Sequence, residues 1–278
     1  MARKFIKTKN EKDVLVVDGL NLAFRYLHNN TKEFANTYIQ TLKSLAQSYS
    51  CGRIIIAADK GSSTYRKNID PEYKGNRKVL REKQTEEEAQ DFTDFIQEFE
   101  NTILQVEELE GYPVLRFQGI EADDIAAYIV KHREDLGINN IKLISSDKDW
   151  SLLLNDNVSQ FSTVTRKEYS LDTWSTHYDF DHELFLTFKC LTGDKSDNIP
   201  GISGIGPKRA TALMEEYGNV FDIYEACPLP GKQKFIQNLN NNYEQLLVNI
   251  ELMHLLEYCD EILENYNDEI NEKIMEYI

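Results

Sequence analysis

Aspartates follow three short apolar runs of the sequence, each at the point where the run ends. The runs are residues 14–17, 54–58 and 141–146, and the aspartates are Asp18, Asp59 and Asp147. Such runs are typical of buried parallel strands, whose carboxyl ends meet at one edge of the sheet. One aspartate after a strand is commonly a helix cap or a turn residue. Three after three strands predict a constellation of carboxylates.

More carboxylates occur in short motifs. Glu121-Ala122-Asp123-Asp124 precedes an apolar run, so it should form the first turn of a buried helix. Acids at a helix N-terminus offset the helix dipole, which accounts for one or two of them but less well for three. The other motifs are Asp147-Lys148-Asp149 and Asp194-Lys195-Ser196-Asp197, whose two aspartates share one face if that turn is helical.

These nine carboxylates could stay ionised in one cluster only if cations were bound among them. Two like charges ~4 Å apart repel by about 4 kcal/mol at an effective dielectric of ~20. Carboxylate oxygens select Mg²⁺ or Mn²⁺, and the five histidines match no zinc spacing. Two divalent ions can activate water and stabilise both oxygens of a phosphodiester displacement. The pattern therefore predicts metal-dependent phosphodiester hydrolysis.

A glycine-rich segment at residues 201–210 predicts a second function. Gly204 and Gly206 permit a tight turn, Pro207 suits the first position of a new helix, and Lys208 follows it. Backbone N–H groups and a helix N-terminus then bind phosphates without reading a base sequence. The alternative is an ordinary joint between two helices. A Walker loop is excluded because its spacing is absent.

The net charge of −16 excludes little, because it is unevenly distributed. Eight basic and three acidic residues lie between Lys60 and Lys83, which indicates either a phosphate-binding segment or a solvated loop. Residues 251–278 hold nine acidic residues and one basic residue. A solvated helical face is the simplest interpretation of that segment.

Helical patterns separate the apolar runs. Tyr38, Leu42 and Leu45 make one helix face, and Thr85 to Glu88 has the form of a capping box before a long amphipathic pattern. Strands that alternate with helices predict a doubly wound parallel sheet. No strand pattern follows residue 185, so we expect an α/β domain at residues 1–185 and a helical region at residues 186–278.

Other classes of protein are excluded by composition. No apolar run reaches the ~18 residues of a membrane span. The N-terminal segment 1–7 is basic without an apolar stretch, so we expect no secretory signal. The four cysteines form no C-x-x-C pair, which argues against a zinc knuckle and a disulfide framework. These features favour a reducing compartment, the cytoplasm.

Several motifs together resemble the 5′-nuclease family, which includes phage flap endonucleases (5′→3′ exonucleases) and the 5′-nuclease domain of bacterial DNA polymerase I. The matching segments, in order, are 17–19, Tyr73-Lys74-Gly75-Asn76-Arg77, 121–124, 147–149, 194–208 and 228–234. The resemblance covers residues 13–240. It leaves the acidic segment at residues 241–278 unmatched.

The resemblance implies a fold and a set of residue roles. The fold is a PIN-like (Rossmann-like) nuclease core, a helical arch at about residues 74–101 and a C-terminal helix–hairpin–helix. Lys74 and Arg77 would approach the scissile phosphate, and Tyr73 would stack near the unpaired terminal nucleotide. The metal ligands would be Asp18, Asp59, Glu121, Asp123, Asp124, Asp147, Asp149, Asp194 and Asp197. The DNA contacts would be Lys189, Gly204, Gly206, Lys208 and Lys234.

The resemblance also implies cofactors and a substrate. It implies two or more Mg²⁺ ions, with Mn²⁺ as a substitute, and K⁺ on the hairpin carbonyls. The substrate would be DNA with a 5′ flap or overhang, or an RNA primer on DNA, cut by a monomer near the junction. Two alternatives stay open: a PIN-type ribonuclease, which has no need of the hairpin, and a junction-binding homologue without catalysis.

Overall fold

The computed structural model describes residues 10–278; the basic segment 1–7 lies outside the described residues. The chain forms two compact units, and neither is continuous in sequence. The core unit comprises the described part of Met1–Gly61 together with Gln84–Leu171 and Cys259–Ile278, and the hairpin unit comprises Ser62–Lys83 and Asp172–Tyr258. These units differ from the expected division at residue 185, because segment 62–83 packs with the later helices and the last helix returns to the core unit.

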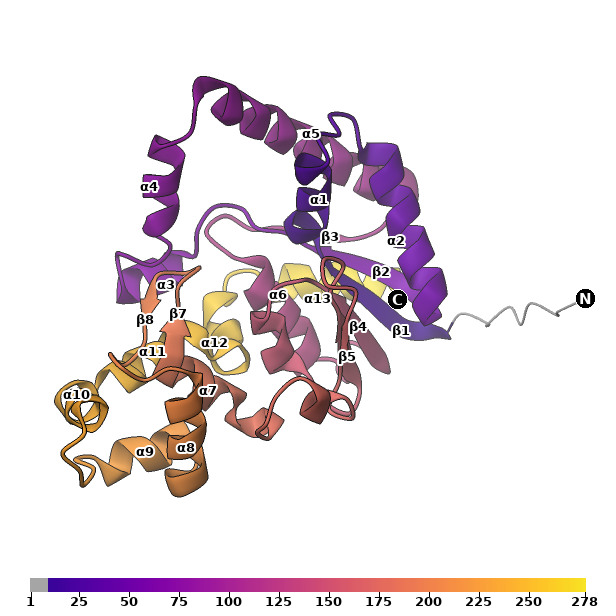
Figure 1. The fold of residues 1–278 in the computed structure, drawn as a ribbon. Coiled ribbons are helices and arrows are strands. Elements are labelled where there is room, and N and C mark those ends of the chain that lie inside the picture. Colours follow the sequence, from indigo (N-terminus) through magenta and orange to yellow (C-terminus); the bar gives the residue numbers. More distant parts are fainter. Residues whose placement is uncertain (1–9) are drawn as a thin grey trace, which may run out of the picture. The chain divides into compact units, whose positions relative to one another are not determined.

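A six-stranded sheet forms the centre of the core unit (Figure 1). Its strands are β1 (Asn10–Asp18), β2 (Cys51–Ala57), β3 (Val114–Leu115), β4 (Asn140–Ile144), β5 (Val158–Phe161) and β6 (Glu168–Tyr169). The spatial order is β3-β2-β1-β4-β5-β6, and only β5 and β6 pair antiparallel. Asp18 pairs with Ala57, and Val17 pairs with Ile144, so β1, β2 and β4 end at one level. The predicted parallel sheet is confirmed.

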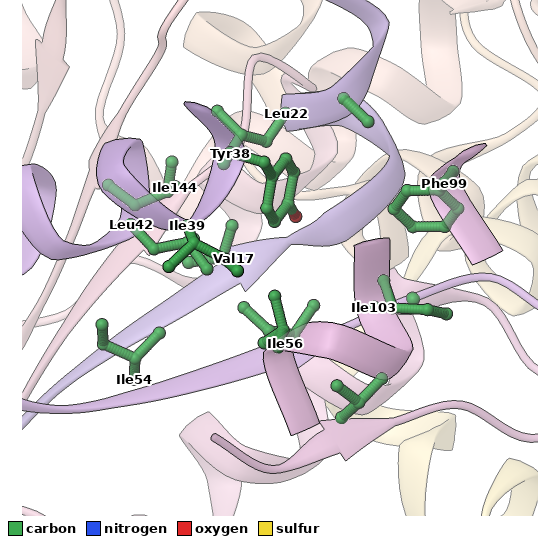
Figure 2. Close-up of a cluster of buried hydrophobic side chains, with 14 of the residues drawn as sticks. Val17, Leu22, Tyr38, Ile39, Leu42, Ile54, Ile56, Phe99, Ile103 and Ile144 are labelled. Atoms are coloured by element: carbon green, nitrogen blue, oxygen red, sulfur yellow. The ribbon is translucent and has the colours of Figure 1, made fainter. Parts of the chain in front are cut away.

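Helices cover both faces of this sheet. They are α1 (Gly19–His28), α2 (Ala35–Tyr49), α5 (Glu86–Glu110), α6 (Ala122–Lys131) and α13 (Asn267–Tyr277). Leu15 and Val17 of β1 share a cluster with side chains of α1, α2 and α5, part of which Figure 2 shows. Val14 and Val16 alternate with them and are equally buried, on the side where α6 contacts β1 and β2.

The long helix α5 begins with the predicted capping box. The Thr85 hydroxyl accepts a hydrogen bond from the Glu88 backbone N–H, and the Glu88 carboxylate accepts one from the Thr85 backbone N–H. Farther along α5, the Glu98 carboxylate accepts hydrogen bonds from the backbone N–H groups of Phe34 and Ala35 at 3.1 and 3.3 Å. Because α2 has no side-chain cap of its own, Glu98 supplies one from another helix.

The hairpin unit is mostly helical. Its elements are α3 (Thr64–Ile69), α4 (Asn76–Glu82), α7 (Phe185–Thr192), β7 (Gly193–Asp194), β8 (Ile199–Pro200), α8 (Pro207–Tyr217), α9 (Val220–Ala226), α10 (Lys234–Asn242) and α11 (Gln245–Met253). Helix α12 (Leu255–Ile262) leads out of it. The expectation that no strand follows residue 185 is wrong, because β7 and β8 pair antiparallel. Two residues are too few to produce an alternating pattern.

Three short helices and two isolated bridges complete the described elements. They are the 3₁₀ helices Asp149–Leu153, Trp174–Thr176 and His182–Leu184, and the bridges between Lys60 and Gln118 and between Asn155 and Val158. No helix within residues 10–278 is long and apolar enough to cross a membrane. All four cysteines are free, as expected, and three of them are buried.

The acidic C-terminal segment folds onto the core unit. Ile270 and Ile274 of α13 are fully buried, while its acidic residues are exposed. The Tyr277 hydroxyl oxygen accepts a hydrogen bond from the Ile54 backbone N–H of β2 at 3.1 Å. The segment is therefore part of the folded core and not only a solvated face.

Replacing Ile274 by alanine should destabilise the core unit by about 2–5 kcal/mol, because it removes a fully buried side chain and leaves a cavity. Met275→Ala is the matched control, because Met275 is the next residue and is 58% exposed. Urea unfolding followed by tryptophan fluorescence, to which the buried Trp150 and Trp174 both contribute, measures both variants. Equal midpoints for the two would show that α13 does not stabilise the core.

Candidate active site

Asp18 lies at the end of β1 and begins α1. Its Oδ1 accepts a hydrogen bond from the Asn21 backbone N–H at 3.0 Å, and its Oδ2 accepts one from the Ser145 hydroxyl at 2.8 Å. Burial and then the negative charge of Asp59 raise the pKa of Asp18 to about 8, and Asp147 adds to this rise. Both of the other strand-end aspartates therefore influence Asp18 directly.

The start of α6 brings further carboxylates to this edge of the core unit. The Asp59 carboxylate accepts the Ala122 backbone N–H at 2.7 Å, which ties the end of β2 to the first turn of α6. Glu121 at the N-cap position and Asp124 in the first turn are both buried. Asp123 accepts a hydrogen bond from the Trp150 indole at 2.6 Å. The structure thus gives Asp123 a tryptophan partner that the sequence motif did not indicate.

The loop after β4 positions the last two carboxylates of the core unit. The Ser145 hydroxyl accepts a hydrogen bond from the Asp147 backbone N–H at 3.1 Å, and Asp147 Oδ1 accepts one from the Asp149 backbone N–H at 2.9 Å. Asp147 is exposed, Asp59 and Asp149 are half-buried, and Asp18 is buried. The carboxylates therefore extend from the interior of the core unit to its surface.

The chemistry of this donor set fits a hard divalent cation. Within residues 10–278, no group of three or more histidine, cysteine, aspartate or glutamate side chains is spaced to hold one metal ion in this structure. All the donors are nevertheless carboxylate oxygens, which suit Mg²⁺ and Mn²⁺. A cation would also stabilise the charged form of Asp18, which burial and the charges of Asp59 and Asp147 disfavour.

The hairpin unit holds Asp194 in a separate polar cluster. Lys189 is buried, and its Nζ lies 3.0 Å from Asp194 Oδ2. Burial raises the pKa of Asp194, but the charge of Lys189 and hydrogen bonds from Ser196 outweigh it and hold the pKa at about 2. Lys189 was expected to contact DNA phosphates. The structure places it inside the unit, where it positions Asp194.

Asp197 binds the three residues that the resemblance assigns to the reacting phosphate and terminal nucleotide. The Tyr73 hydroxyl donates to Oδ2 at 3.1 Å, Lys74 Nζ lies 3.6 Å from the same oxygen, and Arg77 donates to Oδ1 at 3.0 Å. Tyr73 and Lys74 are buried, and the Lys74 backbone is left-handed, with φ of 56°. Tyr73 was expected to stack on a nucleotide, but here its ring lies in the apolar core of the unit.

The segment expected to form an arch contains two helices, α4 and α5, joined through residues 83–85. No residue of α4 is buried, so its basic residues Arg77, Lys78 and Arg81 are accessible. Gly75 precedes this helix, with Glu72 packed against its backbone.

The glycine hairpin has the predicted form. Gly204 has φ of +86°, Gly206 is the N-cap of α8 and Pro207 is at its first turn. Lys208 and Lys234 are exposed. The Arg209 guanidinium donates to the Gly204 carbonyl at 2.5 Å and lies 4.7 Å from the centroid of the Phe235 ring. Sequence reasoning did not find this bracing role, because no local pattern links Arg209 to Phe235.

The Gly204 carbonyl does not fit a potassium ion in this structure. It already accepts a charged donor, and a second cation on the same oxygen would be repelled by Arg209. The neighbouring Ser203 carbonyl also has a donor, because it accepts a hydrogen bond from the Asn238 side-chain amide at 2.7 Å.

Two family models together match nearly all of the chain. The N-terminal resolvase-like domain of 5′-3′ exonucleases matches residues 13–179, and their C-terminal SAM fold matches residues 180–273. The chain is 42% identical over 266 residues to the flap endonuclease of Escherichia phage T5, covering 95% of this chain and 90% of that protein. It is 28% identical to DNA polymerase I of Bacillus subtilis over 88% of this chain, but spans only 28% of the polymerase.

Solved structures agree with these matches. The phage T5 5′-exonuclease with bound divalent metal ions (zinc) superimposes with a TM-score of 0.90 at 42% identity, covering 95% of this chain and 99% of the other. A pseudo-enzyme–product complex of the phage T5 flap endonuclease with DNA and metal ions gives a TM-score of 0.87, also at 42% identity, with coverages of 95% and 97%. The described fold is therefore that of these nucleases.

Proposed function

Because the chain belongs to the 5′-3′ exonuclease family, we propose that it is a structure-specific 5′ nuclease that hydrolyses DNA phosphodiesters near a junction between single strand and duplex. It would act as a flap endonuclease and a 5′→3′ exonuclease. The products would be 5′-phosphate and 3′-hydroxyl ends. The metal requirement would be met by two or more Mg²⁺ ions, with Mn²⁺ as a substitute.

One observation carries this proposal. Asp18 is buried beside the charges of Asp59 and Asp147 at the carboxyl ends of parallel strands. Burying an ionised carboxylate beside two others costs stability, and a bound cation would offset that cost. When bound, divalent ions would lower the pKa of a water molecule and stabilise the charge on the phosphate oxygens.

The side chains of the core unit have defined tasks in this proposal. Asp18, Asp59, Glu121, Asp123, Asp124, Asp147 and Asp149 would hold the ions. Ser145 donates to Asp18 and accepts from the Asp147 backbone, so it would fix both carboxylates at once. Trp150 would fix Asp123 in the same way.

The hairpin unit would position DNA and supply positive charge. Asp194 and Asp197 would serve as metal ligands, and Lys74 and Arg77 beside Asp197 would offset negative charge on the reacting phosphate. Gly204, Gly206, Lys208 and Lys234 would contact the phosphates of a duplex.

The substrate would be DNA with a 5′ flap or overhang, including an RNA primer paired with DNA. The protein would act as a monomer in the cytoplasm, which is the host cytoplasm if a phage encodes it. The arch segment would contact the 5′ single strand.

A 5′-labelled flap duplex tests this function. We expect cleavage near the junction with Mg²⁺, none with EDTA, and none by Asp147→Asn/Asp194→Asn protein, which excludes a contaminating nuclease. Tight, salt-sensitive binding without cleavage would instead show a junction-binding protein. Cleavage of single-stranded RNA in preference to the flap would favour a PIN-type ribonuclease.

A further inference from the structure

Two of the candidate metal ligands, Asp147 and Asp149, lie in the stretch of chain that follows β4. We call residues 145–153 the ligand loop; it ends with the 3₁₀ helix Asp149–Leu153. Carboxylates on a loop bind a cation in a fixed geometry only if the loop backbone is itself held in one conformation. A buried side chain of the neighbouring strand β5 makes the contacts that would do this.

Gln160 of β5 reaches the ligand loop through three hydrogen bonds. Its Nε2 donates to the Ser145 carbonyl at 2.9 Å and to the Asp147 carbonyl at 2.7 Å. Its Oε1 accepts a hydrogen bond from the Ser151 hydroxyl at 2.7 Å. Because a carbonyl can only accept, the amide must keep its nitrogen toward the two carbonyls. The side chain is therefore held in one orientation, and it uses both of its N–H donors on the loop backbone.

The parallel register of the sheet brings Gln160 to this loop. Gln160 pairs with Leu143 of β4, two residues before the loop begins. It shares the buried face of β5 with Val158 and is only 1% exposed. An amide buried in this way costs stability unless its polar atoms are hydrogen-bonded. Its three partners all belong to the ligand loop, so movement of the loop would leave the amide without them.

The contacts of this glutamine extend to several candidate ligands. The bond to the Asp147 carbonyl holds the backbone of a ligand residue itself. Ser151 lies in the 3₁₀ helix that begins at Asp149, so the bond to its hydroxyl holds that helix. The residue before Ser151 is Trp150, whose indole donates to the Asp123 carboxylate at 2.6 Å. One neutral side chain thus contacts the segment that carries two candidate ligands and the partner of a third.

We propose that Gln160 is a positioning residue of the metal centre: it holds the ligand loop so that Asp147 and Asp149 are oriented for divalent cations before a cation binds. This rests on the proposed function, which makes those carboxylates metal ligands. A neutral amide suits the task, because it adds no charge where carboxylates already repel one another. Loss of a group that hydrogen-bonds to metal-binding residues typically weakens metal binding by about 10–100-fold.

Binding of Mn²⁺ to the protein without DNA, followed by electron paramagnetic resonance, tests the proposal without any reaction. Gln160→Met keeps an unbranched side chain of similar length and removes all three hydrogen bonds, so it should weaken Mn²⁺ binding at least about tenfold. Ser151→Ala removes the bond to Oε1 and leaves the two bonds to the carbonyls. It should weaken binding by a smaller factor, and it tests the proposal even if Gln160→Met does not fold.

The double variant Ser151→Ala/Gln160→Met shows whether the two residues act together. If Ser151 acts through Gln160, the double variant should bind Mn²⁺ as Gln160→Met does, within about twofold, because both changes remove the same contact. Two losses that simply multiply would show that Ser151 acts independently of Gln160.

Hydrogen–deuterium exchange of the metal-free protein measures the loop conformation directly. Gln160→Met should speed amide exchange in residues 145–153 by about tenfold, while peptides from α5 exchange as in the wild type. In flap cleavage, the variant should be slow at low Mg²⁺, and high Mg²⁺ should restore its rate to within about threefold of wild type. The carboxylates are intact in this variant, so a higher cation concentration can compensate for a poorly held loop.

Two control variants separate positioning from a general loss of stability. Thr102→Val removes a buried hydrogen bond of the core unit, the bond from the Thr102 hydroxyl to the Glu98 carbonyl of α5. Ile274→Ala removes buried volume under α13. Neither residue belongs to the ligand loop or to β5. Both variants should bind Mn²⁺ within about twofold of wild type, and circular dichroism shows whether all the variants fold.

Three results would overturn the proposal. They are wild-type Mn²⁺ affinity in Gln160→Met, an equal loss of affinity in the two control variants, and unchanged exchange in residues 145–153. A cleavage defect that high Mg²⁺ does not restore, with normal Mn²⁺ binding, would also contradict a role in positioning the ligands. A wild-type protein that bound no Mn²⁺ would contradict the proposed function itself, so the two failures are distinguishable.

Discussion

Asp18→Asn protein should lose at least about 10³-fold in the rate of Mg²⁺-dependent flap cleavage, which corresponds to about 4 kcal/mol of transition-state stabilisation. Asp18 is the most buried of the strand-end aspartates, and it lies beside the charges of Asp59 and Asp147. Asparagine keeps an oxygen that can accept the Asn21 backbone N–H as a helix cap. The variant should therefore fold while offering divalent ions a weaker ligand.

The same variant should respond to metal differently from the wild type. In EDTA it should be more stable by about 1–3 kcal/mol, because a neutral amide replaces a buried carboxylate that has two carboxylate neighbours. Mg²⁺ should raise the melting temperature of the wild type by binding the native state, and this increase should be much smaller for Asp18→Asn. Calorimetric scans with Mg²⁺ and with EDTA measure both effects.

Asp156→Asn is the control for this prediction. Asp156 is exposed in the core unit and is not among the candidate ligands. Its replacement should change neither the cleavage rate nor the effect of Mg²⁺ on the melting temperature. If Asp18→Asn cleaved within tenfold of the wild-type rate, or kept the full response to Mg²⁺, Asp18 would not be a metal ligand.

The gathering of Asp18, Asp59 and Asp147 could be predicted because it follows from a rule about sheets. Parallel strands end at one edge, so residues after three such strands are neighbours whatever lies between them in sequence. The capping box of α5 could be predicted because its partners lie three residues apart. The partners of the capping box are close in sequence, and the three aspartates become close in space once the sheet forms.

Contacts within the hairpin unit could not be predicted in this way. Asp197 forms ion pairs with Lys74 and Arg77, which precede it by more than one hundred residues in the sequence. No periodic pattern connects such positions. The burial of Lys189 against Asp194 was missed for a different reason, because a lysine in an apolar helix suggests an exposed charge.

The C-terminal segment shows how composition can mislead. Nine acidic residues between Glu251 and Ile278 suggested a solvated face. Ile270 and Ile274 lie one helical turn apart on one face of α13. The helix therefore buries both side chains while its acidic residues stay exposed to solvent.

Lys74→Ala should lower the cleavage rate at saturating DNA by about 10²–10³-fold and change the dissociation constant for DNA by less than about threefold. Lys74 is buried, and its Nζ lies 3.6 Å from the Asp197 carboxylate. A cation held in this way adds little to the initial binding of DNA. Its charge matters at the reacting phosphate, where negative charge increases in the transition state.

Lys78→Ala is the matched control for Lys74→Ala, because Lys78 is an exposed lysine of α4, four residues farther along the chain. Loss of an exposed cation should weaken DNA binding and reduce its salt dependence, with little effect on the single-turnover rate at saturation. Single-turnover kinetics over a range of enzyme concentrations separate rate from affinity for both variants. If Lys74→Ala changed affinity and left the saturated rate intact, Lys74 would be a DNA contact and not a catalytic residue.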